Sequence, residues 1–144
     1  MIGHINIDGL PLNRRQFMSS QKRRILIVED ENIIALDIRS MLEDLGYMVS
    51  AIVSSGEESI QKASHMKPDL VLMDIKLKGR IDGVNAGEEI NKQFHIPIVY
   101  LTAYSDQATI KRIHNGKNGH ASTVIYKPFD EGELQTAINS TLAH

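Results

Sequence analysis

The chain has 144 residues, with a hydrophobic content of 42%, a charged content of 24% and a formal net charge of -2 at pH 7. This length predicts one domain with a sizeable core, and the nearly balanced charge gives no reason to expect direct nucleic-acid binding. There is no cysteine, which excludes disulfides, thiolate metal sites and a thiol nucleophile. The apolar runs are of strand length, far below the roughly 20 residues that span a bilayer, so we expect a cytoplasmic protein without membrane association.

Residues 1–22 differ in composition from the rest of the chain. Residues 1–12 contain Gly and Pro with a weak apolar alternation, and residues 13–22 are polar and basic. We therefore expect residues 1–22 to form an N-terminal extension, either flexible or artificially added. Residues 23–144 are expected to form the globular domain.

From residue 23 onward, strand-like and helix-like patterns alternate. Residues 24–28 form an apolar run typical of a buried strand, and residues 47–53 predict a second strand. Between them, apolar residues recur on one helical face and Gly46 ends the pattern. These apolar residues are Ile34, Ile38, Met41, Leu42 and Leu45.

The next two helices have recognisable starts. Ser55 and Glu58 form a capping-box pattern that predicts a short helix ending before Lys67-Pro68. A third strand follows and ends at Asp74. After a loop over residues 75–83, which closes with the turn pair Asp82-Gly83, a third helix is expected. Its inward residues are Val84, Gly87, Ile90 and Phe94.

The pattern continues to the end of the chain. Residues 96–101 predict a fourth strand, Ser105 is expected to cap a helix that buries Ile110 and Ile113, and a fifth strand follows. Asp130 and Glu133 form a second capping-box pattern that opens the last helix. Five β–α units imply an α/β fold, with a parallel sheet covered by helices on both faces.

Four of the apolar runs end in polar residues. The runs end at Glu29 and Asp30, at Asp74, at Thr102 and at Lys127. In open α/β sheets, ligands bind at the carboxyl ends of the strands. We therefore expect these side chains to meet at one edge of the sheet.

These residue types suit phosphoryl transfer. Asp74 is the candidate nucleophile, because a carboxylate can accept a phosphoryl group as an acyl phosphate. Glu29 and Asp30 supply carboxylates for Mg²⁺ or Mn²⁺, while Lys127 and the Thr102 hydroxyl can neutralise and bind phosphoryl oxygens. Without metal, the clustered carboxylates should repel one another and raise the pKa of at least one of them.

Each of these residues also has an ordinary structural explanation. An aspartate at a strand end is commonly a helix cap or turn residue, and an acidic run commonly opens a helix. A lone threonine or lysine carries little information. Their joint occurrence, each at the end of an apolar run, favours the functional interpretation.

Residues 23–144 resemble the receiver domain of two-component response regulators. The segments that carry the resemblance are Ile-Leu-Ile-Val-Glu-Asp-Glu at 25–31, Leu-Val-Leu-Met-Asp-Ile-Lys-Leu at 70–77, Asp-Gly at 82–83, Leu-Thr-Ala at 101–103 and Lys-Pro-Phe at 127–129. The resemblance implies a flavodoxin-like (βα)₅ fold with strand order 2-1-3-4-5. It also implies that Asp74 accepts a phosphoryl group from a phosphohistidine on a sensor histidine kinase or a histidine phosphotransfer protein.

The same resemblance assigns further roles. Asp30, Asp74 and the Lys76 backbone carbonyl would bind Mg²⁺ directly, with Glu29 acting largely through water. Thr102 would shift toward the phosphoryl group on activation, and the Lys127-Pro128 peptide bond would be cis. The signal would pass to a downstream protein target or to a covalently linked output domain.

Two departures from the usual receiver pattern concern the loop after Asp74 and the fifth strand. The loop contains Lys78-Gly79-Arg80 in place of a shorter turn that often contains proline. Val124 occupies the switch position, three residues before Lys127, where receivers often have Tyr or Phe. Tyr126 is expected on the opposite face of the strand. We therefore expect the surface around the fourth helix and fifth strand to change less on activation.

A third departure concerns hydrolysis of the acyl phosphate. Lys76 and Tyr104 lie two residues after Asp74 and Thr102, at positions that gate the attacking water in this family. Large side chains there should crowd the water and slow self-dephosphorylation.

Three alternatives share parts of this pattern. A haloacid-dehalogenase-like phosphatase needs an acid two residues after its nucleophile, where this chain has Lys76, and the chain leaves no room for a cap domain. A receiver-like module could bind partners without phosphorylation, but the complete set of acids, Thr102 and Lys127 argues against this. A flavin carrier of the same fold would need a phosphate loop where the chain has its acidic run.

Overall fold

The protein is described by a computed structural model over residues 22–103, 105–114 and 122–143. Residues 1–21, which make up nearly all of the expected N-terminal extension, lie outside this description. The helices and strands follow the order β1 (Arg24–Val28), α2 (Asn32–Asp44), β2 (Met48–Val53), α3 (Gly56–Met66), β3 (Leu70–Asp74), α4 (Gly83–Phe94), β4 (Ile98–Ala103), α5 (Gln107–His114), β5 (Ser122–Lys127) and α6 (Glu131–Leu142).

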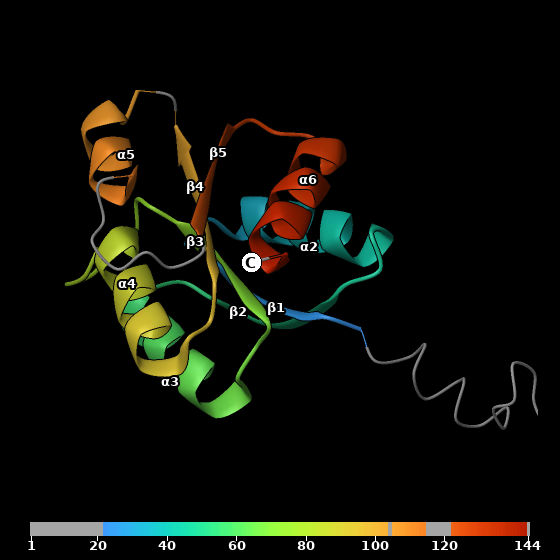
Figure 1. Ribbon diagram of the computed structural model, residues 1–144, viewed down its shortest axis with the longest axis horizontal. Coiled ribbons are helices and arrows are strands. Elements are labelled where there is room, and N and C mark those ends of the chain that lie inside the picture. Colours follow the sequence, from blue (N-terminus) through green and yellow to red (C-terminus); the bar gives the residue numbers. More distant parts are fainter. Residues whose placement is uncertain (1–21, 104, 115–121, 144) are drawn as a thin grey trace, which may run out of the picture.

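The five strands form one parallel sheet in the order β2-β1-β3-β4-β5. Helices α3, α4 and α5 lie on one side of the sheet, and α2 and α6 lie on the other (Figure 1). The predicted α/β class and strand order are therefore confirmed. Parallel strands run in one direction, so all five carboxyl ends lie along one edge.

The central strands are fully apolar because both of their faces are covered. Leu26 and Val28 pack toward α3 and α4, whereas Ile25 and Ile27 pack toward α2 and α6. All four residues have no exposed surface. We refer to these two packed layers as the α3/α4 core and the α2/α6 core. Together they fix the sheet, and with it the positions of the residues that follow each strand.

Several predicted element boundaries shift for local reasons. The second strand begins at Met48, because the Tyr47 N–H still closes the end of α2 on the Leu42 carbonyl. The fourth strand begins at Ile98, after Pro97, which has no N–H to donate to a neighbouring strand. The expectation for Ser105 as N-cap is wrong, since α5 begins at Gln107 and the residue preceding it is Asp106.

The predicted caps of α3 and α6 are confirmed with one change of partner. Asp130 and Glu133 form both halves of a capping box at α6. At α3, the Ser55 hydroxyl accepts the Glu58 N–H, but the Glu58 carboxylate accepts the N–H of Ser54 rather than that of Ser55. Both helices therefore begin where the sequence pattern places their starts.

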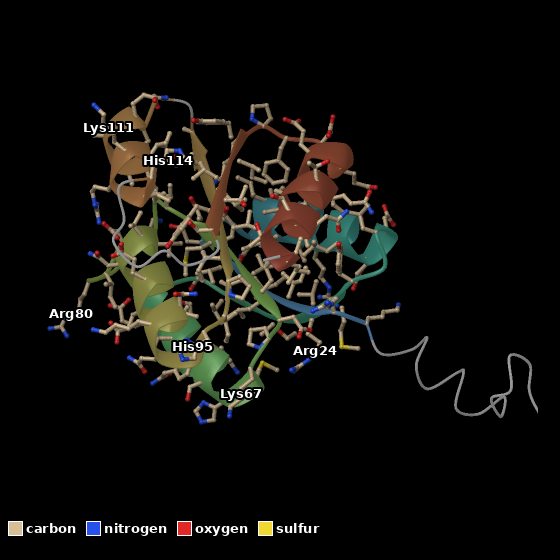
Figure 2. The ribbon with its side chains drawn as sticks, viewed as in Figure 1. Arg24, Lys67, Arg80, His95, Lys111 and His114 are labelled. Carbon is tan, nitrogen blue, oxygen red and sulfur yellow. The ribbon has the colours of Figure 1, made fainter. Side chains whose placement is uncertain are left out.

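Arg24 joins the start of the sheet to the end of α3. Its guanidinium donates to the carbonyls of Met66 (2.7 Å) and Lys67 (2.6 Å), and Figure 2 shows Arg24 and Lys67 at the same end of the molecule. These bonds satisfy carbonyls that the helix end leaves unpaired. Of the helices in the described residues, none combines the length and apolar character needed to cross a membrane.

Candidate functional site

Three charged side chains meet at the carboxyl edge of the sheet. The Lys127 Nζ lies 3.3 Å from Glu29 Oε1 and 3.3 Å from Asp74 Oδ2. Glu29 is 1% exposed and Asp74 is 4% exposed. These residues follow or end β1, β3 and β5, which are far apart in sequence. The fold therefore brings together two buried carboxylates and one ammonium group.

Two further acids extend this cluster toward solvent. Carboxylate oxygens of Glu29, Asp30 and Glu31 lie within 4.8 Å of one another. The Glu31 N–H also donates to Glu29 Oε2 at 3.1 Å, which orients the buried carboxylate. Glu31 was given no role in the sequence analysis, although its position in the acidic run was the available signal.

The electrostatics of the cluster are those of crowded acids. Burial raises the pKa of Glu29 to about 7, and repulsion from Asp74 adds to this effect, while the Glu31 N–H and Lys127 oppose it. Burial acts to lower the pKa of Lys127, but the Asp74 and Glu29 carboxylates outweigh it and raise that pKa above its ordinary value. The pKa of one carboxyl is therefore raised, as expected, although burial contributes more to this than the repulsion between carboxylates.

The donor set fits a hard divalent cation. Carboxylate oxygens of Glu29 and Asp30 lie close together, and Lys127 contacts the carboxylates of Glu29 and Asp74. When all three acids are ionised, one ammonium group leaves their charge incompletely compensated. Mg²⁺ binds through one or two carboxylates together with water and other oxygen ligands, and a cation there would also favour the ionised form of Glu29.

The remaining predicted site residues lie around this cluster in different ways. Thr102 is buried, and its hydroxyl donates to the Ala103 carbonyl at 3.2 Å. Lys76 is joined to Asp74 through its backbone, since its N–H donates to Asp74 Oδ1 at 3.1 Å. Tyr104 lies outside the described residues, so its expected gating role stays a prediction.

The fifth strand requires one correction. Val124 packs against the α3/α4 core, and it lies in register with Tyr100 of β4. Side chains alternate along a strand with a period of two, so Tyr126 lies on the same side as Val124. The expectation that it occupies the opposite face is wrong. Tyr126 is in register with Thr102. The Lys127-Pro128 bond is cis, as the resemblance implied.

The loop after Asp74 is attached to α3. The Arg80 N–H donates to Glu57 Oε2 at 3.0 Å, and Gly79, with φ of +114°, leaves room for the Glu57 carboxylate beneath it. The Arg80 side chain projects outward on the α4 side of the sheet (Figure 2). The sequence pattern alone does not indicate a role for Glu57, because an acid in the first turn of a helix is already explained by the helix dipole.

A parallel five-stranded domain with an acid–lysine cluster at its carboxyl edge has the architecture of a phosphoacceptor receiver. The family model for the response regulator receiver domain matches residues 25–139. The chain therefore belongs to the response regulator receiver domain family of two-component signalling. The sequence resemblance and the strand order lead to the same family.

Similar proteins support this membership. The chain is 39% identical over 116 residues to the transcriptional regulatory protein PdtaR of Mycobacterium tuberculosis, covering 81% of this chain and 55% of that protein. The chain thus spans about half the length of this curated relative.

Two solved structures are similar in fold and sequence. The signal receiver domain of a modulated diguanylate cyclase from Desulfovibrio desulfuricans matches with a TM-score of 0.77 and 30% identity, covering 85% of this chain and 95% of that one. The receiver domain of the sensor histidine kinase PA1611 from Pseudomonas aeruginosa matches with a TM-score of 0.72 and 31% identity, covering 85% and 99%. That structure has a magnesium ion coordinated in its active-site cleft.

Proposed function

We propose that this receiver domain, spanning residues 23–144, accepts a phosphoryl group on Asp74. The observation that carries the proposal is the ion pair between Lys127 Nζ and Asp74 Oδ2, 3.3 Å long, at the carboxyl end of the buried strand β3. In the reaction, a carboxylate oxygen of Asp74 forms a bond to phosphorus as the phosphorus–nitrogen bond of a phosphohistidine breaks. The departing imidazole keeps the electron pair and takes up a proton.

A bound Mg²⁺, or Mn²⁺ in its place, would neutralise charge on the phosphoryl oxygens. Asp30, Asp74 and the Lys76 backbone carbonyl would hold the ion, and Glu29 would contribute largely through water. The support for this assignment is the crowded set of carboxylates around Glu29 and the magnesium in the PA1611 receiver structure. Carboxylate, carbonyl and water oxygens are the ligands that Mg²⁺ prefers.

Lys127 and Thr102 would bind the phosphoryl group after transfer. Lys127 already contacts the Asp74 carboxylate. Its ammonium group can act as a point charge that neutralises a phosphoryl oxygen other than the one next to Mg²⁺. The Thr102 hydroxyl makes a long bond of 3.2 Å to a neighbouring carbonyl, and it would turn from there to a phosphoryl oxygen. A charge-assisted bond to phosphate is stronger than the one it replaces.

The surface beside Lys127 suits a protein phosphodonor. A groove of about 370 Å³ lies between α2 and the residues that follow β5. Next to it on α2, Ile33 is 84% exposed and Leu36 is 58% exposed. Exposed apolar side chains around a groove are typical of a binding surface. We assign this surface to a sensor histidine kinase or a histidine phosphotransfer protein.

The domain would act in the cytoplasm as a signalling phosphoacceptor and not as an enzyme with a substrate of its own. Its output would be contact with a downstream protein or a linked output domain, since the curated relative is about twice the length of the matched region. The alternative of a phosphatase lacks support at Lys76, where that class needs an acid. No direct contact with nucleic acid or membrane is part of the proposal.

Binding of a phosphoryl analogue tests the proposal. Beryllofluoride with Mg²⁺ should bind the wild-type protein and shift the amide signals of residues around Asp74, and omission of Mg²⁺ or the substitution Asp74→Asn should abolish the shifts. Glu89→Gln, at a partly exposed position on α4, is the matched control and should behave as the wild type. An equal response of Asp74→Asn and the wild type would refute the assignment of Asp74.

A further inference from the structure

Tyr100 carries a buried hydroxyl that the proposed chemistry does not use. The residue lies on β4 and is 1% exposed. Within the part of the chain that the structure describes, its hydroxyl has no hydrogen-bond partner. A buried polar group without a partner loses its bonds to water and gains nothing in return. Such a group in a small core requires an explanation.

The hydroxyl lies directly against the backbone of α4. A β-carbon built at Gly87 would lie 2.8 Å from Tyr100 Cζ, a distance that real β-carbons essentially never show, so the Tyr100 ring or α4 would have to shift. Glycine in the middle of a helix is destabilising compared with alanine. Gly87 therefore has a clear role, because it lets the phenol of β4 touch the helix backbone. The pair fixes the distance between β4 and α4.

Tyr100 and the proposed phosphoryl contact Thr102 lie two residues apart on β4, so their side chains are on the same face. Among the described residues, the Tyr100 hydroxyl has no hydrogen-bond partner, and the Thr102 hydroxyl makes a long bond of 3.2 Å to the Ala103 carbonyl. Burial raises the pKa of Tyr100, so its hydroxyl keeps the proton and remains a donor. The neighbour in register on β5 is Val124, whose side chain offers no acceptor.

Helix α4 is connected to the site at its first turn. The Gly83 N–H donates to the Ile75 carbonyl, one residue after Asp74. The adjacent Asp82 caps α4 and pairs with Arg112 of α5 at 3.5 Å. A change at the end of β3 or β4 would therefore alter how α4 lies on the sheet. Tyr100 is the side chain of β4 that contacts α4.

We propose that the Tyr100 hydroxyl gains a hydrogen-bond partner when Asp74 is phosphorylated, so that Tyr100 transmits the state of the site from β4 to α4. Tyr100 would act as a positioning residue. Val124 cannot act in the same way, because its side chain forms no hydrogen bonds. The inference rests on the proposed function of Asp74. In this chain the aromatic side chain that transmits the signal would be Tyr100 on β4, which contacts α4. The position on β5 where receivers often have Tyr or Phe is occupied by Val124.

The substitution Tyr100→Phe tests this, because it removes the hydroxyl and keeps the ring. In the free protein, the variant should have a higher melting temperature, by about 4 °C, since an unpartnered buried hydroxyl is removed. Its Mg²⁺-dependent affinity for beryllofluoride should fall about five- to tenfold, because the hydroxyl bond formed only in the bound state is lost. The amide signal of Gly87 should shift on binding in the wild type and shift less in the variant.

Tyr47→Phe is the matched control. The Tyr47 hydroxyl bonds to Asn139 at 3.3 Å in an exposed position, so its removal should leave the beryllofluoride affinity unchanged and should not raise the melting temperature. A lower melting temperature for Tyr100→Phe would show that the hydroxyl is already satisfied, and an unchanged affinity would show no coupling. Either result overturns the inference. If the wild-type protein itself showed no Mg²⁺-dependent binding of beryllofluoride, the proposed function would be overturned as well. The wild-type result therefore distinguishes a failure of the inference about Tyr100 from a failure of the proposed function.

Discussion

Gly83 lies directly against the backbone of Asp74. A β-carbon at Gly83 would be 2.9 Å from the Asp74 carbonyl carbon and 2.8 Å from the Ile75 Cα, distances that real β-carbons essentially never show. Both atoms belong to the backbone at the end of β3, the strand that carries the proposed phosphoacceptor, so neither can move aside cheaply. The glycine of the Asp82-Gly83 pair therefore serves close approach to the site as well as turn formation.

The first prediction follows from this contact. Gly83→Ala should lower the free energy of unfolding by about 3 kcal/mol, because overpacking against a rigid backbone forces β3 or α4 to shift. It should also slow phosphorylation, since Asp74 would move. Urea unfolding monitored by circular dichroism measures the stability change.

The matched control for this prediction is Gly132→Ala on α6. A β-carbon there would lie 3.4 Å from Asp130 Oδ1, which is ordinary contact. Alanine is the better helix former, so this variant should be neutral or more stable by about 0.5 kcal/mol. If Gly83→Ala unfolded at the same urea concentration as the wild type, the contact with Asp74 would have no structural importance.

The second prediction concerns protons and Mg²⁺. The pKa of Glu29 is raised from 4.5 to about 7 in the metal-free protein, so the folded state binds more protons than the unfolded state between these values. The contribution of Glu29 to the free energy of unfolding is thus fully present below pH 4.5, and it is lost as the pH rises through about 7. Mg²⁺ requires the ionised form, and its binding should release close to one proton at about pH 6 and few at about pH 8.5.

Isothermal titration calorimetry in buffers of different ionisation enthalpy gives the number of protons released. Glu29→Gln is the control, because it removes the titrating group while keeping the shape of the side chain. Its Mg²⁺ binding should release fewer protons near pH 6. Equal proton release by the two proteins would assign the effect to another group.

The third prediction concerns Lys127 as the counter-charge of two buried acids. Lys127→Met should destabilise the metal-free protein at about pH 8 by roughly 2 kcal/mol, less than for a fully buried pair because the lysine side chain is 26% exposed. Saturating Mg²⁺ should recover part of this loss. Lys111→Met, at an exposed position on α5, should have little effect on thermal unfolding. Similar losses in both variants would argue against a specific role for Lys127.

The fourth prediction concerns the lifetime of the phosphorylated state. Lys76 and Tyr104 occupy the positions expected to gate the attacking water, so Tyr104→Ala should speed the decay of the acyl phosphate severalfold. Loss of the phosphorylated species with time, followed by mass spectrometry after removal of the phosphodonor, measures the rate. An unchanged decay in both Tyr104→Ala and Lys76→Ala would exclude the crowding explanation.

Sequence patterns predicted the parts of the fold that depend on local periodicity. The fully apolar run of β3, the capping box of Asp130 and Glu133 and the strand order implied by the resemblance are all present. The meeting of Glu29, Asp74 and Lys127 followed from one topological rule, since parallel strands place their carboxyl ends at the same edge.

Other features depend on contacts between residues distant in sequence, which periodicity does not contain. The contact between Glu57 and the Gly79-Arg80 loop joins α3 to the segment after β3. The fit of Tyr100 to Gly87 joins β4 to α4. The rotation of the Thr102 hydroxyl toward Ala103 depends on which acceptors surround it in the unphosphorylated state. These contacts decide how the site is coupled to its surroundings.

The most direct test of the central claim is the intact mass of the protein after incubation with Mg²⁺ and acetyl phosphate. We expect a gain of about 80 Da in the wild type, which is lost on treatment with hydroxylamine and absent from Asp74→Ala. Tyr100→Phe should still form the adduct, since Tyr100 is not part of the chemistry. An adduct that persists in Asp74→Ala, or no adduct in a wild-type protein that binds Mg²⁺, would contradict the assignment of Asp74 as the phosphoacceptor.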